Sequence, residues 1–414
     1  MKIMKTAWRN LWRSRGRTLL SASAILVSAL IITLLLGFET GFVGDMVQNV
    51  TGNMTGQIRV MNADYVKNER VTPLQFFIPD TAKALAALSS AEGTRLATAK
   101  SEFGVSLYRN GEQVPVRAIG LDFAQSPIIT GKNANLASGR FPEKGKNEIL
   151  VSAGLSSELG IKAGDRLTAI TRTAIQGSNG RTFTVTGVLA LSDISMINRV
   201  IFMDWNLAGD FLRMNGNALQ VQVFLKKGVS ETQALPAVKA ALSGAGYGEG
   251  ALESTIWYDV SGMYSFFKVA DAMYLIISAI FFALASTVVI NTTMMSVLER
   301  RKEIGALGAL GMEKNRIVAL FLAESLLIGV MGTAAGTLLG FAGVTVMGRV
   351  GFDVNLFGGD SLTGFNISQF IYPSLEPHKY FIVAAIGVAI TLAACFLPAR
   401  MAAAIEPAEA LRDK

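Results

Sequence analysis

Cysteine and histidine are almost absent from this sequence. Its 414 residues include one cysteine, Cys395, and one histidine, His378. A single cysteine cannot form an intramolecular disulfide, and the two residues together supply too few ligands for a typical zinc site. We interpret Cys395, which lies in an apolar run, as a small packing residue, and His378, which lies in a polar loop, as a solvated side chain.

Motifs for nucleotide hydrolysis and nucleophilic catalysis are also missing. Both Gly-Lys pairs, at 131–132 and 145–146, are followed by asparagine, so no phosphate-binding loop occurs. The sequence has no His-Glu-x-x-His, no Gly-x-Ser-x-Gly and no second histidine for a Ser/His/Asp triad. The acidic residues Asp64, Asp122, Asp165 and Asp193 stand singly among turns, where solvation or capping is the usual role. We therefore predict a non-catalytic chain with no cofactor or metal of its own.

Charged residues are scarce. They make up 17% of the chain, against 51% hydrophobic residues, and the mean hydropathy is +0.41. This composition is unusual for a soluble protein of this length and indicates an integral membrane protein. The formal net charge is +7, but the basic excess lies beside apolar runs, so we expect no nucleic-acid partner.

Four apolar runs are long enough to span a membrane. We predict an α-helical membrane protein with spans at 18–42, 269–298, 316–348 and 380–398. The first span has the basic start and apolar core of a signal peptide. It is longer than a usual signal core and no small-x-small cleavage site follows it, which favours an uncleaved anchor.

Residues 1–17 carry six basic residues and no acidic residue. In a helix, one face holds Lys2, Lys5, Arg9 and Arg13, and the other holds Ile3, Met4, Ala7, Trp8, Leu11 and Trp12. Tryptophans at headgroup depth with basic residues meeting anionic lipid are typical of an interfacial helix. The alternative is a disordered basic tail.

Residues 43–268 have a different character, with turns, charges and short β-like runs. We predict a large mixed α/β domain with helical stalks at both ends, large enough for its own core and for two subdomains. Asn110-Gly111 predicts a two-residue hairpin. Further strands are predicted at 148–152, 166–172, 181–189, 199–203 and 218–225, with a turn at 177–180.

Two helices are predicted within this domain. They cover 80–90 and 230–243, and Asp80 and Ser230 are the candidate N-caps.

The distribution of lysine and arginine predicts the orientation. The N-terminus, the link at 299–316 and the tail at 399–414 together hold fourteen of these residues, whereas the loop at 349–379 holds two. This predicts cytoplasmic termini and a cytoplasmic link, with the α/β domain outside. We expect a multi-pass protein of a bacterial inner membrane with this domain in the periplasm.

The link at 299–315 is too densely charged to lie in hydrocarbon. Its charged start followed by apolar residues at helical spacing predicts a short amphipathic helix that contacts a partner. We expect the charges at the membrane boundary and the apolar side chains in a groove of the partner. The candidate contact residues are Glu299, Arg300, Arg301, Lys302, Glu303, Ile304, Leu307, Leu310 and Gly311.

The third span contains two unusual features. Gly332, Gly336 and Gly340 recur every four residues, which predicts close approach of another helix; plain helix flexibility is the alternative. Glu324 is the one acidic residue that interrupts the apolar run of a span, since the runs at 19–38 and 272–298 carry no charge, and such a residue is a functional candidate. It lies about two turns after Arg316, near the interface, so we favour a structural polar contact.

The order of these segments and three motifs resemble a known family. The motifs are AWRNLWRSRGRTLL, SVLERRKEIGALGALGMEKNRIVALFLAESLLIGVMG and FLPARMAAAIEPAEALR. They resemble FtsX-like permeases, the transmembrane subunits of MacB-type and LolC/LolE-type ABC transporters. In the tail, Met401 stands where family members commonly carry a second basic residue.

The resemblance implies a set of partners. These are a cytoplasmic ABC ATPase dimer that binds ATP and Mg²⁺, and a second permease, either another copy or a paralogue. MacB-type proteins usually carry the ATPase at their N-terminus, and its absence here implies a stand-alone subunit.

The stretches TGQIRVMNADYV and FNISQFIYPSLEPHKY look closer to the LolC/LolE group. That resemblance implies extraction of lipoproteins, or similar amphiphiles, from the inner membrane, with delivery to a periplasmic carrier. Apolar residues at the stalk bases either line an opening for acyl chains or face lipid and each other; they are Phe38, Phe42, Met46, Phe266, Phe267 and Met273. Two alternatives remain: a MacB-like exporter of peptides or toxins that uses an adaptor, and an FtsX-like regulator that transports nothing.

Overall fold

The structure is a computed structural model that describes residues 2–109, 111–131, 134–191, 199–260, 263–353 and 370–406. These residues form two compact units. The helical unit consists of Met1–Val43, Phe266–Asp353 and Phe370–Lys414, and the α/β unit consists of Gly44–Ser265 and Val354–Gln369.

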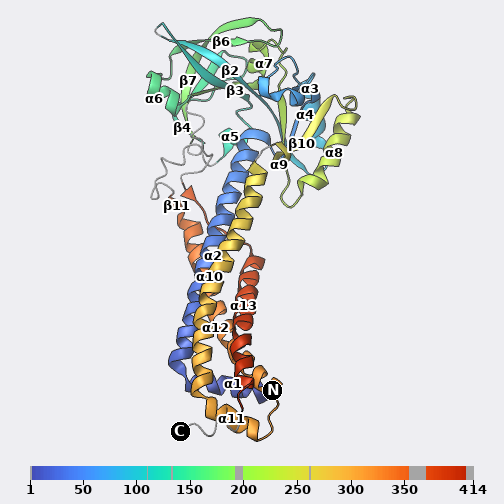
Figure 1. Ribbon diagram of the computed structural model, residues 1–414. Coiled ribbons are helices and arrows are strands. Elements are labelled where there is room, and N and C mark those ends of the chain that lie inside the picture. The colour runs from blue at the N-terminus through green and yellow to red at the C-terminus, as the bar shows by residue number, and fades with distance from the viewer. Residues whose placement is uncertain are drawn as a thin grey trace. The chain divides into compact units, whose positions relative to one another are not determined.

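Long helices make up most of the helical unit (Figure 1). They are α2 (Arg15–Asn49), α10 (Met263–Glu299), α12 (Lys314–Val350) and α13 (Pro377–Ala403). Within the described residues, four helices are long and apolar enough to cross a membrane, and the α/β unit follows the first of them along the chain. This confirms the predicted fold class: four membrane-spanning helices with a large α/β domain between the first two.

Two short helices precede α2 and connect α10 to α12 (Figure 1). They are α1 (Lys2–Arg13) and α11 (Arg301–Ala309). α1 is separated from α2 at Ser14 and packs against α12. Its buried side chains are Ala7 and Leu11, while Trp8 and Trp12 are exposed. The helix is therefore amphipathic, and its contact with lipid stays a prediction.

α12 presents three glycines to α2 at a spacing of four residues. A Cβ atom at Gly332 would lie 2.9 Å from the carbonyl oxygen of Ala22, and one at Gly340 would lie 2.6 Å from Cβ of Thr33. Gly336 is buried between them. The absence of side chains thus allows the two backbones to approach closely. We call these glycines and the α2 residues that they face the glycine seam.

A short strand pair stands between α12 and α13. β11 (Phe352–Asp353) is antiparallel to β12 (Phe370–Ile371). The residues between these strands, 354–369, lie outside the described part of the chain.

One mixed sheet organises the α/β unit. Its strand order is β10-β1-β9-β2-β3-β8-β5-β7-β4, and β6 pairs with both β2 and β7. The strands are β1 (Ile58–Asn62), β2 (Thr94–Arg109), β3 (Glu112–Leu121), β4 (Ala134–Gly139), β5 (Glu148–Ser152), β6 (Arg166–Arg172), β7 (Ser178–Leu191), β8 (Val200–Asp204), β9 (Gln220–Leu225) and β10 (Leu252–Ile256).

Short helices cover this sheet. They are α3 (Ala63–Lys67), α4 (Thr81–Ser90), α5 (Pro127–Thr130), α6 (Ala153–Leu159), α7 (Trp205–Phe211), α8 (Glu231–Gly244) and α9 (Trp257–Val260). The core falls into separate apolar clusters. One joins α4 and α8 to β1 and β9, and another surrounds Phe183 and Phe211, whose ring centroids are 5.2 Å apart.

Several sequence predictions for this unit are confirmed. β5 and β6 have the predicted bounds, and the β2–β3 register pairs Arg109 with Glu112, which leaves a two-residue turn whose Gly111 has φ +85°. The predicted turn at 177–180 is wrong, because β7 already begins at Ser178. The turn lies at 173–177 instead, where the amide of Thr173 donates to the carbonyl oxygen of Gly177.

Asp80 and Ser230 occupy the predicted N-cap positions of α4 and α8, but without the expected capping hydrogen bonds. Asp80 adopts the left-handed conformation with φ +51°. The amide of Thr81 instead donates to Oδ1 of Asn217, 136 residues away, at 2.9 Å.

Candidate functional site

The link between α10 and α12 is made by two breaks in the helical backbone. α10 ends at Glu299, and Arg300 has non-helical φ −97° and ψ 14° before α11 begins. After α11, Gly311 has φ +88°, and the amide of Met312 donates to the carbonyl oxygen of Leu307 at 3.0 Å. Glycine ends a helix in this left-handed conformation with little strain. α11 is therefore a separate short helix and not a continuation of α10.

The apolar side chains of α11 and of its C-cap residue, Leu310, lie in different surroundings. Ile304 is 4% exposed and packs in an apolar cluster with Val297, Ile317, Phe321, Ala399, Ala402 and Ala403. Leu307 is half-buried, whereas Leu310 is 86% exposed. This differs from the expectation that Ile304 contacts a partner, because α10, α12 and α13 of the same chain already cover it.

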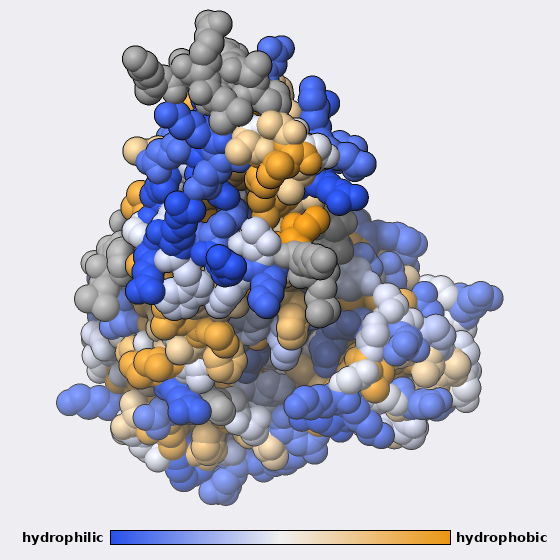
Figure 2. All heavy atoms as spheres, turned by 90° about the horizontal axis from the view of Figure 1, so that it is seen from below, coloured by the Kyte–Doolittle hydropathy of each residue, from blue (hydrophilic) through white to orange (hydrophobic). Residues whose placement is uncertain are grey.

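The residues predicted at the charged part of the link differ in exposure. Glu299, Lys302, Glu303 and Gly311 are exposed, while Arg300 and Arg301 are half-buried. Viewed from below, hydrophilic residues gather over the near end of the helices beside exposed hydrophobic ones (Figure 2). This side of the helical unit is thus a mixed surface, and Leu310, the C-cap residue of α11, is 86% exposed.

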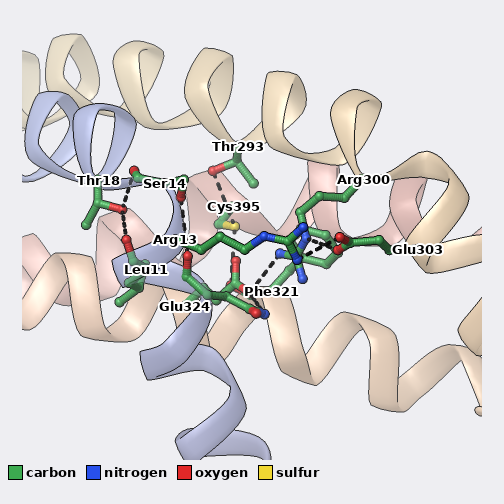
Figure 3. A network of polar contacts seen from close by, with 11 residues as sticks. Leu11, Arg13, Ser14, Thr18, Thr293, Arg300, Glu303, Phe321, Glu324 and Cys395 are labelled. Carbon is green, nitrogen blue, oxygen red and sulfur yellow. Dashed lines mark hydrogen bonds and ion pairs between the residues drawn. The ribbon is translucent and has the colours of Figure 1, made fainter.

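Glu324 lies on α12 and is only 8% exposed. Its Oε1 accepts a hydrogen bond from Nδ2 of Asn10 at 2.6 Å. It accepts another from Nη1 of Arg300 at 3.0 Å (Figure 3). A carboxylate within a span is costly unless it is paired. Because Asn10 and Arg300 both donate to it, the carboxylate of Glu324 is paired and forms a structural contact between helices.

Arg300 connects this carboxylate to α11. Its Nε lies 3.2 Å from Oε2 of Glu303, and its guanidinium carbon lies 5.7 Å from the ring centroid of Phe321. Arg13 of α1 also pairs with Glu303, at 2.8 Å (Figure 3). We call Asn10, Arg13, Arg300, Glu303 and Glu324 the Glu324 cluster. It joins α1, the start of α11 and α12 through charged, directional contacts.

A small polar cavity of about 40 Å³ lies beside the cluster, between α1, α2, α10 and α12. Arg17 lines it and pairs with Glu299 at 2.6 Å. Nη1 of Arg17 is buried and has no hydrogen-bond partner among the described residues. The cavity has room for one water molecule, which would satisfy this nitrogen.

The described residues contain no cluster of metal-ligating side chains. Among them, no group of three or more His, Cys, Asp or Glu side chains could hold a metal ion. Asp64 lies in α3, and not in a turn as predicted, and pairs with Lys67 at 2.9 Å. Asp122 accepts a hydrogen bond from the amide of Ala124 at 2.8 Å, as expected for an acidic residue in a turn. Asp193 lies outside the described residues.

The described residues among those predicted to receive acyl chains differ in exposure. Phe38 and Phe42 are half-buried, and the ring of Phe38 lies 5.3 Å from that of Phe352. Met46 is 1% exposed, whereas Met273 is exposed. The side chains of Phe266 and Phe267 lie outside the described part of the chain. Substrate contact at these residues stays a prediction.

Sequence reasoning missed the partners of Glu324. Asn10 is separated from it by 314 residues and Arg300 by 24. The available signal was an acidic residue one or two turns inside a span, close to an arginine at the end of the preceding span. That pattern points to Arg300 but not to Asn10.

Two family profiles match the sequence. The FtsX-like permease C-terminal profile matches residues 275–407, and the MacB-like periplasmic core domain profile matches residues 18–241, more than half of the chain. The chain belongs to the FtsX-like, MacB-type family of ABC transporter permeases. Permeases of this family are multi-pass membrane subunits that work with ATPase partners.

The similar proteins include some named LolC and some named MacB. The lipoprotein-releasing system transmembrane protein LolC of Neisseria meningitidis serogroup B is 22% identical over 316 residues, which cover 73% of this chain and 74% of that protein. The macrolide export ATP-binding/permease protein MacB of Psychrobacter cryohalolentis is 36% identical over 124 residues, which cover 30% of this chain and 16% of that protein. The crystal structure of the periplasmic region of MacB from Actinobacillus actinomycetemcomitans has a TM-score of 0.38 at 14% identity, covering 52% of this chain and 95% of that one.

Proposed function

We propose that this permease extracts lipoproteins, or similar amphiphiles, from the inner membrane and is driven by a separate cytoplasmic ATPase dimer that binds ATP and Mg²⁺. The observation that carries the coupling part is the Glu324 cluster, which ties α11 to α1 and α12. The similarity to a protein named LolC over 73% of this chain supports the substrate class.

The ATPase contacts α11 at its exposed C-terminal end. Leu310 enters an apolar groove of the ATPase, and the exposed charges of Lys302 and Glu303 face its rim. Ile304 acts from inside the chain: because it packs against Ile317 and Val297, a displacement of α11 also displaces α10 and α12. We assign these two different roles because Leu310 is exposed and Ile304 is buried.

The movement then passes along continuous helices to the periplasmic side. α2 runs from Arg15 to Asn49, and α10 runs from Met263 to Glu299, each without a break. Helices of this length transmit displacement because their backbone hydrogen bonds resist bending. The chain needs two arrangements of these helices, biased by the nucleotide state of the ATPase.

A MacB-like export of peptides or toxins is the second candidate. It is favoured by the match to the MacB-like periplasmic core domain and by relatives named MacB. In that function the α/β unit contacts a periplasmic adaptor, whereas in lipoprotein release it contacts a carrier.

The deciding experiment is purification of the full complex, with its ATPase, in lipid nanodiscs followed by mass spectrometry. We expect triacylated lipoproteins to be retained, to stimulate ATP hydrolysis and to leave the complex when ATP is added. A matched sample with the ATPase inactivated should retain the lipoproteins without releasing them. Consistent absence of lipoproteins, together with ATP hydrolysis that does not respond to them, would contradict the proposal.

A further inference from the structure

An apolar groove of about 390 Å³ lies beside α1 in the helical unit, and the coupling scheme does not use it. Its large side chains are Trp8, Leu11, Trp12, Leu19, Leu26 and Met331. The small residues Ala22, Gly332 and Ala335 also line the groove, at the place where α2 and α12 approach closely. Because their side chains are short, they leave this space among the larger side chains. The volume lies in the usual range for a small-molecule site.

The polar groups of this groove are concentrated at Arg15. Its Nε donates to the carbonyl oxygen of Trp12 at 3.3 Å, and its guanidinium carbon lies 4.9 Å from the centroid of the Trp12 ring. Thr18 and Ser23 also line the groove, but their hydroxyls already donate to backbone carbonyls. Within the described residues, Arg15 forms no ion pair with an acidic side chain. Its terminal nitrogens thus remain available to an anion.

We propose that this groove binds an acyl chain of an anionic phospholipid from the cytoplasmic leaflet, while Arg15 binds the lipid phosphate. Residues 2–17 contain no acidic residue, so the charge of this segment complements an anionic headgroup. A guanidinium binds phosphate through two parallel hydrogen bonds. Exposed tryptophans such as Trp8 and Trp12 are typical of headgroup depth.

Two other occupants fit the groove less well. A helix of a second copy would fill its apolar part but would leave Arg15 without a counter-charge. A zwitterionic lipid offers a phosphate together with a cation, which weakens the attraction to a basic segment. The proposal concerns a resident lipid and does not depend on the transported substrate.

The test uses quenching of tryptophan fluorescence by brominated lipids. The full chain is placed in phosphatidylcholine nanodiscs that contain a small fraction of brominated phosphatidylglycerol or, in parallel, brominated phosphatidylcholine. Trp8 and Trp12 report on the groove, while Trp205 and Trp257 belong to the α/β unit and give a constant background. We expect stronger quenching by the brominated phosphatidylglycerol.

The variants Arg15→Gln and Arg9→Gln form a matched pair, because each removes one exposed positive charge from the same segment and only Arg15 lines the groove. Arg15→Gln should weaken phosphatidylglycerol binding about tenfold, the value of one charge-assisted hydrogen bond. Arg9→Gln should change it no more than about twofold, because salt screens a charge outside the site. Ala335→Phe should abolish the preference by filling the groove, and Ala334→Phe should not.

Three results would overturn the proposal. The first is equal quenching of the native chain by the two brominated lipids. The second is an equal loss in Arg9→Gln and Arg15→Gln, which would indicate a general attraction of the basic segment. The third is efficient cross-linking of two copies through Ser23→Cys with no lipid preference, which would identify a second copy as the occupant. If Ala335→Phe does not fold, the arginine pair still decides the question.

Discussion

The Glu324 cluster and the glycine seam occupy neighbouring parts of α12 and hold it in different ways. At the cluster, the amide of Asn10 and the guanidinium of Arg300 converge on the carboxylate of Glu324. At the seam, the backbone of α12 lies directly against α2, and a Cβ atom at Gly340 would lie 2.6 Å from Thr33. Charged pairs can exchange partners, whereas close backbone packing tolerates little displacement. We infer that α12 moves with α2 as one body and that changes in contact are confined to the cluster.

The largest effect should follow from disrupting the seam. A Cβ atom at Gly336 would meet the carbonyl oxygen of Leu26 and would lie 2.7 Å from Cβ of Ala29. Gly336→Leu should therefore destabilise the protein by about 3 kcal/mol or more. Thermal unfolding in detergent measures this change. Ala334→Leu, at an exposed position of the same helix, is the control, and equal stability of the two variants would contradict close packing at the seam.

The next effect should come from the cluster. Glu324→Leu leaves the guanidinium of Arg300 half-buried with Glu303 as its remaining carboxylate partner, at a cost of about 2 kcal/mol. Glu324→Gln retains an acceptor and should cost less. Combining Glu324→Leu with Arg300→Met should restore part of the stability, because the unpaired charge is removed. Strictly additive losses in denaturant unfolding would show that the two groups do not interact.

A smaller effect, on partner binding alone, should follow from Leu310→Asp. Because this side chain is 86% exposed, the substitution should leave the unfolding transition unchanged. It should weaken co-purification of the ATPase about tenfold, the contribution of one buried leucine at an interface. Ile304→Asp should instead lower the melting temperature. Loss of stability in Leu310→Asp, or unchanged ATPase association, would contradict the assignment of this surface.

The smallest effect concerns an ion pair outside the membrane. Glu102 lies 3.2 Å from Lys100 and 3.1 Å from Arg117, and these cations, Lys100 first, lower the pKa of its carboxyl group below 4.5. The carboxylate therefore stabilises the folded α/β unit above about pH 4.5, and this contribution is lost as the pH falls through the lowered pKa.

Glu102→Gln should cost about 1 kcal/mol at pH 7, because water screens a side chain that is 40% exposed. In urea unfolding, the difference from the native chain should shrink and vanish as the pH falls through the lowered pKa of Glu102. Glu92→Gln, at an exposed carboxylate, is the control. A stability difference that persists at acidic pH would argue against the pairing.

Features that depend on local sequence were predictable. Hydrophobic runs determine the spans, and Gly111 with its left-handed conformation determines the β2–β3 turn. Features that depend on long-range contacts were not. Asn217 reaches the start of α4 from 136 residues away, and Asn10 reaches Glu324 from 314 residues away. Ile304 shows a third limit: an amphipathic pattern identifies the apolar face of a helix but not whether the chain itself or a partner covers it.

Because α2 is one unbroken helix, only insertions of certain lengths within it keep the chain that follows in the same orientation. Its 35 residues extend about 52 Å, well beyond the roughly 30 Å of a bilayer's hydrocarbon. Inserting one residue between Phe38 and Asn49 would advance the following chain by about 1.5 Å and turn it by about 100°. An insertion of seven residues would nearly restore the angle. Viable variants of this segment should therefore differ by whole numbers of helical turns.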